Sequence, residues 1–204
     1  MNLGIKEACG DYIGIVETDD YIQSDMYERL YDVVVGNPEE EIDFVKAGYN
    51  QIAECKGKVF CLPFTRDFDK SMLNRVLDLV EERNMYDLNH IWSGIYRRDF
   101  LIGNSLWFNE TMGASYQDTS FSLLVNLVAE RCVYIGYEGY NYRTDNEGSS
   151  VKSDTKIDCV IHEYEYVVNK LKQLGLYDDV RKRLVLTNKL YTCLLYTSPS
   201  PRDS

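Results

Sequence analysis

An apolar run, YIGIV at residues 12–16, leads directly into the acidic residues Glu17, Asp19 and Asp20. The run is short and follows a glycine and an aspartate, which favours a strand buried on both faces of a parallel sheet. A helix is predicted at residues 24–37, because apolar residues recur there at helical spacing and a proline follows. A strand, an acidic turn and a helix in this order indicate an α/β fold.

The chain continues to alternate short apolar segments with amphipathic ones. Strands are expected at residues 42–51, 59–64 and 132–137, and helices at residues 71–80, 118–130, 155–174 and 178–191. We therefore predict an α/β fold with a mainly parallel, Rossmann-like sheet flanked by helices and followed by carboxyl-terminal helices.

The last segment, CLLYTSPSPRDS at residues 193–204, differs from everything before it. It holds two of the four prolines, has no apolar period and follows a helix that it is not expected to continue. It also resembles the tail that results when sequencing-adapter DNA is translated. We interpret it as a non-native tail and leave it out of the fold prediction.

Charge and cysteine content argue against several classes of protein. The chain has 22 basic and 33 acidic residues, a net charge of −11, so neither nucleic acid nor an anionic lipid surface is expected as the main partner. The six cysteines form no CxxC pair and the chain has two histidines, so reduced thiols are expected and a zinc site is not. We find no signal peptide and no transmembrane segment, and expect a cytoplasmic protein or one attached peripherally at the inner face of the membrane.

The acidic turn after residues 12–16 has two interpretations. Carboxylates at the carboxyl end of a buried parallel strand lie where open α/β sheets bind ligands, and hard divalent cations prefer such oxygen ligands. An acidic pair in a turn is, taken alone, more simply explained as a solvated loop before a helix. The choice depends on the rest of the sequence.

Four segments in order resemble motifs of family 2 glycosyltransferases, inverting enzymes of the GT-A fold that use nucleotide-activated sugars. They are NLGIKEACGDYIGIVETDDYI at 2–22, WSGIYRRDFL at 92–101, SYQDTSF at 115–121 and YNYRTDNEGSS at 140–150. Each motif is weak by itself, but the four together are specific. This resemblance favours the ligand-binding interpretation of the acidic turn.

The resemblance implies roles for individual residues. Asp20 matches the aspartate that binds a divalent cation, Mg²⁺ or Mn²⁺, and Asp19 matches a position that contacts the nucleotide-sugar. Asp118 matches the catalytic base. Two positions depart from the family pattern, because Glu17 stands where many members have aspartate and Gln117 replaces a glutamate that often precedes the base. The roles of Glu17 and Gln117 are therefore open.

Other side chains near these motifs have a functional and a structural interpretation. Arg143 could contact the donor's diphosphate, and surface packing is an equally good explanation for it. Four aromatic residues could stack on sugar rings, although aromatic residues are more often part of the core or anchor loops: Trp92, Tyr96, Trp107 and Tyr116. His90 is expected to be structural or at the surface.

The resemblance implies a hexosyltransferase that moves a sugar from a nucleotide-sugar, with a UDP-sugar favoured, to the hydroxyl of a saccharide or lipid-linked acceptor. Residues 1–150 would form a partial GT-A domain without its first nucleotide-binding strands, and residues 151–192 a helical extension. We expect this fragment to be inactive alone. Two alternatives remain open, a different metal-dependent nucleotide-processing α/β enzyme and a non-catalytic module.

Overall fold

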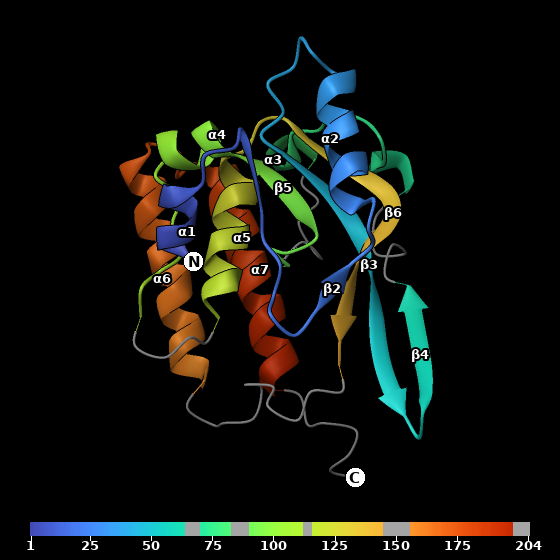
Figure 1. Cartoon of the computed structure of the whole chain (residues 1–204). Coiled ribbons are helices and arrows are strands. Elements are labelled where there is room, and N and C mark those ends of the chain that lie inside the picture. The colour runs from blue at the N-terminus through green and yellow to red at the C-terminus, as the bar shows by residue number, and fades with distance from the viewer. Residues whose placement is uncertain (64–69, 83–89, 112–115, 145–155, 198–204) are drawn as a thin grey trace.

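A computed structural model describes residues 1–63, 70–82, 90–111, 116–144 and 156–197. The strands are β1 (Tyr12–Gly14), β2 (Tyr21–Ile22), β3 (Phe44–Cys55), β4 (Lys58–Pro63), β5 (Gly94–Arg97) and β6 (Cys132–Arg143). The helices are α1 (Asn2–Glu7), α2 (Met26–Gly36), α3 (Leu79–Glu82), α4 (Arg98–Gly103), α5 (Gln117–Val128), α6 (Lys156–Gln173) and α7 (Asp179–Thr197), with a 3₁₀ turn at Lys70–Met72. Strands and helices alternate through most of the chain, which confirms the predicted α/β class (Figure 1).

One sheet runs through the molecule in the order β1-β5-β3-β6-β2, and β4 pairs with β3 outside this path. Among the strands that the structure describes, β3 and β6 are parallel and every other pair is antiparallel. The predicted mainly parallel sheet is therefore wrong, and the sheet is mixed. The prediction failed at β1, which is an edge strand with one buried side chain, Ile13, rather than a central strand. It failed also at β4, because Lys56 and Gly57 have positive φ angles and form a tight hairpin that reverses the chain.

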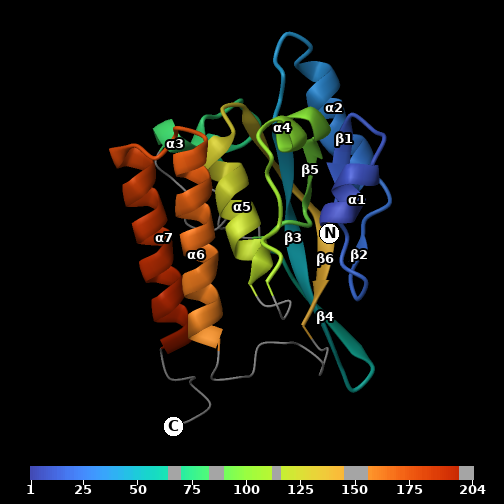
Figure 2. The ribbon, with the colours of Figure 1, turned by 90° about the vertical axis from the view of Figure 1, so that its left-hand side faces the viewer.

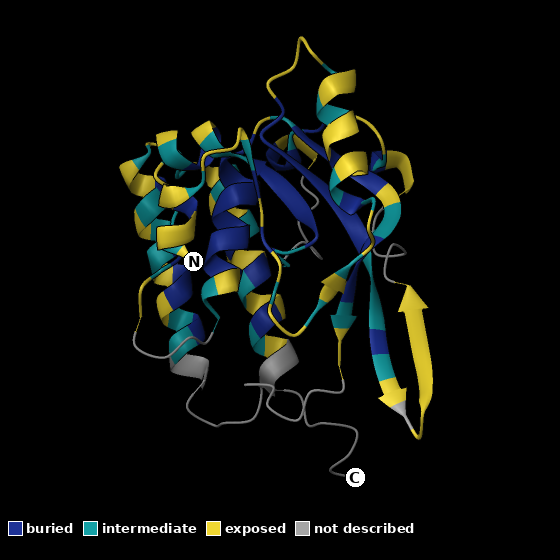
Figure 3. Ribbon diagram, viewed as in Figure 1, coloured by how far each residue is buried: buried dark blue, intermediate teal, exposed yellow. Residues whose placement is uncertain are grey.

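The sheet is covered on both faces by helices. The helices α5, α6 and α7 lie side by side on one face, and α2 lies on the other (Figure 2). Figure 3 shows that the first part of β3, residues 44–48, and most of β5 are buried between these layers, whereas β4 is exposed along its length. Helix α5 is buried from Thr119 to Val128, so only its first turn reaches the surface. This burial fixes the position of that turn relative to the sheet.

The helix predicted at residues 71–80 is wrong. After the 3₁₀ turn, Asn74 has a φ angle of 58° and its N–H donates to the carbonyl of Tyr134 at 2.8 Å. Leu73 and Leu77 then form isolated bridges with β6, and the helix begins only at Leu79. A left-handed residue interrupts a helix, and the apolar spacing of this segment suits burial against the sheet equally well.

The other elements are confirmed with shifted ends. Helix α7 extends to Thr197, five residues into the segment that was expected to lie outside the fold. Within the ranges described, none of the helices combines the length and the apolar character needed to cross a bilayer.

Asp43, immediately before β3, anchors three segments and is 3% exposed. Its Oδ1 accepts from Arg97 Nη2 at 2.7 Å, and its Oδ2 accepts from the N–H groups of Glu130 and Arg131 at 3.0 and 3.1 Å. We expect Asp43→Ala to lower the free energy of unfolding by about 3–5 kcal/mol, because it removes the buried partner of Arg97 and leaves the N–H groups of Glu130 and Arg131 without their acceptor. Urea unfolding followed by circular dichroism would measure the change.

Glu41→Ala is the matched control for this prediction. Glu41 pairs with the same arginine, but its side chain is 74% exposed, so its loss should change the free energy of unfolding by no more than about 0.5 kcal/mol. Equal effects of the two substitutions would contradict the anchoring role of Asp43.

Candidate functional site

The acidic turn between β1 and β2 is clamped by the end of β6. Asp20 Oδ2 accepts from the Tyr140 hydroxyl at 2.8 Å, and Asp20 Oδ1 accepts from the N–H of Arg143 at 2.8 Å. The Tyr140 hydroxyl in turn accepts from the N–H of Glu17 at 3.1 Å. These bonds join residues more than a hundred positions apart, and they orient the Asp20 carboxylate.

Asp118 lies in the exposed first turn of α5, where a carboxylate interacts favourably with the helix dipole. Tyr116, the residue immediately before α5, has a φ angle of 68°, and this left-handed conformation directs the chain into the helix. Gln117 contacts the segment that precedes α5. Its Nε2 donates to the carbonyl and hydroxyl of Thr111 at 3.3 and 3.2 Å, so Gln117 braces the segment before α5.

The fold brings Asp118 and the acidic turn into one electrostatic cluster. The pKa of Glu17 is raised by partial burial and then by the charges of Asp19, Asp118 and Asp20. The pKa of Asp20 is also raised by burial, although its hydrogen bonds oppose the shift. The pKa of Asp118 is raised because neighbouring protein reduces its solvation, even though its side chain is accessible to water. We call Glu17, Asp19, Asp20 and Asp118 the acidic cluster.

These raised pKa values determine how folding stability changes with pH. A carboxyl whose pKa is raised on folding binds a proton more tightly in the folded state than in the unfolded state. Glu17, Asp20 and Asp118 therefore lower folding stability at neutral pH, and this effect is relieved as the pH falls toward their raised pKa values. A positive ligand would relieve it in the same way.

Aromatic side chains pack beside the acidic cluster. Trp92 stacks on Tyr140 with ring centroids 4.1 Å apart and on Tyr142 at 5.5 Å, and it meets Tyr49 edge-on at 5.0 Å. The pKa of Tyr142 is raised by burial and then by Asp20, Asp19 and the other two members of the acidic cluster, which shows that this ring lies near it. The sequence singled out Trp92, but no local pattern identified the three tyrosines as its partners.

Several residues considered from the sequence lie elsewhere or are structural. Tyr96 is fully buried and its hydroxyl donates to the carbonyl of Ile91, so it belongs to the core. Trp107 packs against the hydrophobic core, and Lys6 Nζ lies 5.4 Å from the centroid of its ring. Burial and then Lys46 lower the pKa of His90 to about 3, so its imidazole is neutral and structural, as expected. Arg143 is exposed, and its backbone N–H donates to Asp20 Oδ1.

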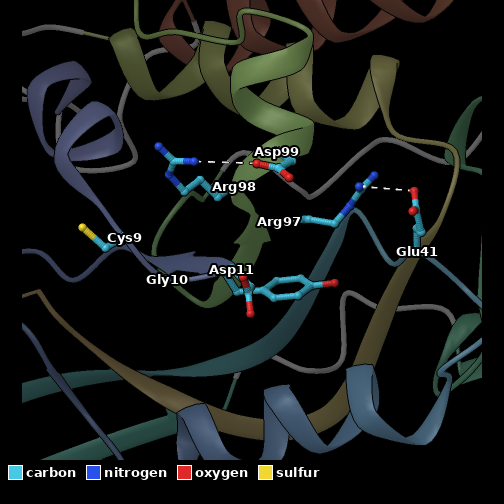
Figure 4. A pocket seen from close by; sticks show the side chains of 8 residues that line it. Cys9, Gly10, Asp11, Glu41, Arg97, Arg98 and Asp99 are labelled. Atoms are coloured by element: carbon cyan, nitrogen blue, oxygen red, sulfur yellow. Dashed lines mark hydrogen bonds and ion pairs between the residues drawn. The ribbon is translucent and has the colours of Figure 1, made fainter.

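A surface pocket of about 340 Å³ lies at the opposite end of β1 from the acidic cluster. Figure 4 shows Arg97 and Arg98 at this pocket, each close to a carboxylate. Arg97 pairs with Glu41 and Asp43, and Arg98 donates to the carbonyl of Ala8 at 2.7 Å. The charges of this pocket are largely occupied by structural contacts, and it is separate from the acidic cluster.

The acidic cluster supplies oxygen ligands of the type that Mg²⁺ and Mn²⁺ prefer. Within the part of the chain that the structure describes, no group of three or more His, Cys, Asp or Glu side chains is arranged to hold a metal ion. A cation at this site would therefore need further ligands from water or from a bound molecule.

Curated proteins similar in sequence to this chain are named glycosyltransferases. The chain is 31% identical over 144 residues to the uncharacterized glycosyltransferase EpsJ of Bacillus subtilis, covering 70% of this chain and 40% of that protein. It is 25% identical over 201 residues to glycosyltransferase GlyG of Streptococcus pneumoniae, covering 90% of this chain and 65% of that protein. The chain thus spans less than two thirds of these relatives. No family model matches it.

Solved structures share the fold. The crystal structure of S. aureus TarS 1–349 in complex with UDP-GlcNAc aligns over 94% of this chain and 52% of that chain, with a TM-score of 0.67 and 17% sequence identity. The complex of the same fragment with UDP aligns over 92% of this chain and 48% of that chain, with a TM-score of 0.57 and 15% identity. The α/β fold with a mixed sheet and flanking helices is therefore that of TarS.

Proposed function

We propose that this chain, a relative of bacterial glycosyltransferases in sequence and in fold, carries the catalytic face of an enzyme that transfers a sugar from a nucleotide-sugar to an acceptor hydroxyl. The observation that carries the proposal is the acidic cluster, in which Asp118 of α5 couples electrostatically to the turn after β1. The names of the relatives support glycosyl transfer, and the complexes of TarS with UDP-GlcNAc and with UDP support a UDP-sugar as the donor.

Asp118 is the proposed general base of an inverting transfer. Its carboxylate accepts the proton of the acceptor hydroxyl while the hydroxyl oxygen bonds to the anomeric carbon. The bond between the anomeric carbon and the diphosphate oxygen breaks on the opposite face, and its electron pair leaves with the nucleoside diphosphate. A base must be ionised to act, and exposure at a helix N-terminus favours the ionised form whereas the surrounding protein disfavours it. Because these two effects oppose each other, Asp118 is suited both to accept the proton of the acceptor hydroxyl and to release it afterwards.

Asp20 is the proposed ligand of a divalent cation, Mg²⁺ or Mn²⁺, and Asp19 the proposed contact to the donor. The pKa values of Glu17 and Asp20 are raised first by partial burial and then by neighbouring carboxylates, and a bound cation would favour the ionised form of both groups. Phosphate oxygens of the donor and water would complete the coordination. When bound, such a cation neutralises charge on the leaving diphosphate.

The acceptor is proposed to be a saccharide or a lipid-linked saccharide. Partly exposed Trp92 and Tyr142 lie beside the acidic cluster and offer apolar ring surface of the kind that sugars pack against. Arg143, exposed at the end of β6, is proposed to contact the diphosphate, and Gln117 to shape the approach to Asp118.

The test is donor consumption by the complete gene product, measured with a panel of UDP-sugars in the presence and absence of saccharide acceptors. We expect at least one donor to be consumed about tenfold faster or more with an acceptor present. Equal consumption without acceptor would instead indicate a nucleotide-hydrolysing or nucleotidyl-transferring enzyme. No consumption and no donor binding would indicate a non-catalytic module.

A further inference from the structure

Glu163 is a buried carboxyl on α6 that faces the start of α5. It is 1% exposed, although glutamate is rarely buried without partners. Its Oε2 forms a short hydrogen bond with the hydroxyl of Ser120, and its Oε1 accepts from Asn109 Nδ2 at 3.1 Å. One side chain thus joins α6, the first turn of α5 and the segment that precedes α5.

We propose that Glu163 is a positioning residue for Asp118, holding the first turn of α5 at the acidic cluster through Ser120. The inference rests on the proposed function, in which Asp118 is the base. Ser120 lies two residues after Asp118 and is itself fully buried, so its position is set by the bond to α6. A shift of about 1 Å in a reacting group can lower a rate by about a hundredfold.

Ser120 connects Glu163 to the first turn of α5. Its hydroxyl donates to Glu163 Oε2 on α6 and lies 3.2 Å from the carbonyl of Gln117 in its own turn. Glu163 also accepts from Asn109, so one carboxyl holds both the first turn of α5 and the segment before it.

Charged groups from neighbouring segments act on Glu163. Its pKa is raised by burial, and Asp118 on α5 raises it further, whereas the bonds from Ser120 and Asn109 and the charge of His162 lower it. Glu110, in the segment before α5, adds negative charge nearby, since it and Glu163 both raise the pKa of Tyr166.

Two substitutions of Glu163 separate positioning from bulk stability. Glu163→Gln keeps an amide that donates to Ser120 Oγ and a carbonyl that accepts from Asn109, so kcat should stay within about threefold of the wild type. Glu163→Ala removes both bonds, so kcat should fall about 10- to 100-fold while the donor KM changes less than about threefold. The assay uses the complete gene product under the conditions of sugar transfer.

Tyr164→Phe is the matched control. Tyr164 is the next residue on α6, is equally buried, and directs its hydroxyl to Asn188 at 2.6 Å and Thr192 at 2.8 Å on α7, away from α5. This variant should lower the melting temperature but leave kcat unchanged. A normal kcat for folded Glu163→Ala, or a loss of kcat in Glu163→Gln equal to that in Glu163→Ala, would overturn the proposal.

Hydrogen exchange tests the positioning without activity, and distinguishes it from a failure of the proposed function. The amides of residues 121–123 close the first turn of α5 and should exchange at least about tenfold faster in Glu163→Ala, but not in Glu163→Gln or Tyr164→Phe. If the wild type transfers no sugar, the proposed function fails and this measurement alone decides the positioning. Unchanged exchange in Glu163→Ala would overturn it.

Discussion

Asp118→Asn is expected to lower kcat of sugar transfer by about 10²- to 10⁴-fold while the donor KM changes little. The amide keeps the shape of the carboxylate and its place in the first turn of α5, but it has no basic oxygen to accept the acceptor's proton. Because the base acts on the acceptor rather than on the donor, donor binding should persist. Steady-state kinetics at saturating acceptor, with donor titrated, measures both quantities.

The pH profile gives an independent check on the same residue. The pKa of Asp118 is raised above the usual aspartate value of about 3.9 by its surroundings. A base works when deprotonated, so kcat should fall as the pH drops through this raised pKa, and the low-pH limb should begin at a higher pH than for a free aspartate. In Asp118→Asn that limb should disappear from the residual activity.

Asp99→Asn is the matched control, because Asp99 is also an aspartate in the first turn of a helix, α4, with an 84% exposed side chain at the opposite end of β1 from the acidic cluster. It should leave kcat and its pH profile unchanged. Activity of Asp118→Asn close to that of Asp99→Asn would show that Asp118 is not the base.

Asp20→Asn is expected to lower kcat/KM for the donor by at least about 100-fold and to weaken activation by Mn²⁺ by about 10- to 100-fold. The carboxylate accepts hydrogen bonds at both oxygens, from Tyr140 and from the N–H of Arg143. An asparagine replaces one acceptor by an NH₂ group that faces a donor, so the substitution removes charge and also disturbs the turn. The measurement is a titration of activity with Mn²⁺ after removal of divalent cations by a chelator.

Tyr140→Phe separates these two effects. It removes the hydroxyl that holds Asp20 but leaves the carboxylate charge, so the Mn²⁺ dependence should shift less than in Asp20→Asn. If Asp20→Asn responds to Mn²⁺ as the wild type does, Asp20 is not a cation ligand. If the wild type is active after chelation, the proposed cation has no part in the transfer.

Much of the local structure could be predicted because it depends on neighbours in sequence. The strand at residues 12–14 lies within a short apolar run, and the helices at residues 26–36, 117–128 and 156–173 follow from apolar residues at helical spacing. The segment at 71–80 shows the limit of that signal. Its apolar spacing is helical, yet Asn74 adopts a left-handed conformation and the leucines bridge to β6, because contacts with the sheet outweigh helical propensity there.

The candidate site was predictable in its residues but not in its construction. Asp19, Asp20 and Asp118 were identified through motifs, and the structure places Asp118 within electrostatic reach of the acidic turn. Their roles remain predictions. The clamp of Tyr140 on Asp20 was not predictable, because nothing in the local pattern links positions separated by 120 residues.

The amino-acid sequence alone determined the α/β class, the acidic turn after the first strand and the presence of Asp118 in the first turn of a helix. Each of these features depends on residues that lie close together along the chain. The tertiary structure decided the direction of the strands, the packing of Trp92 against the tyrosines of β6, and the burial of Glu163 against Ser120. The physical reason is that these features depend on which distant segments share a core. The free energy gained by burying apolar surface and by pairing buried polar groups depends on contacts between distant segments, so it cannot be assigned to any single segment.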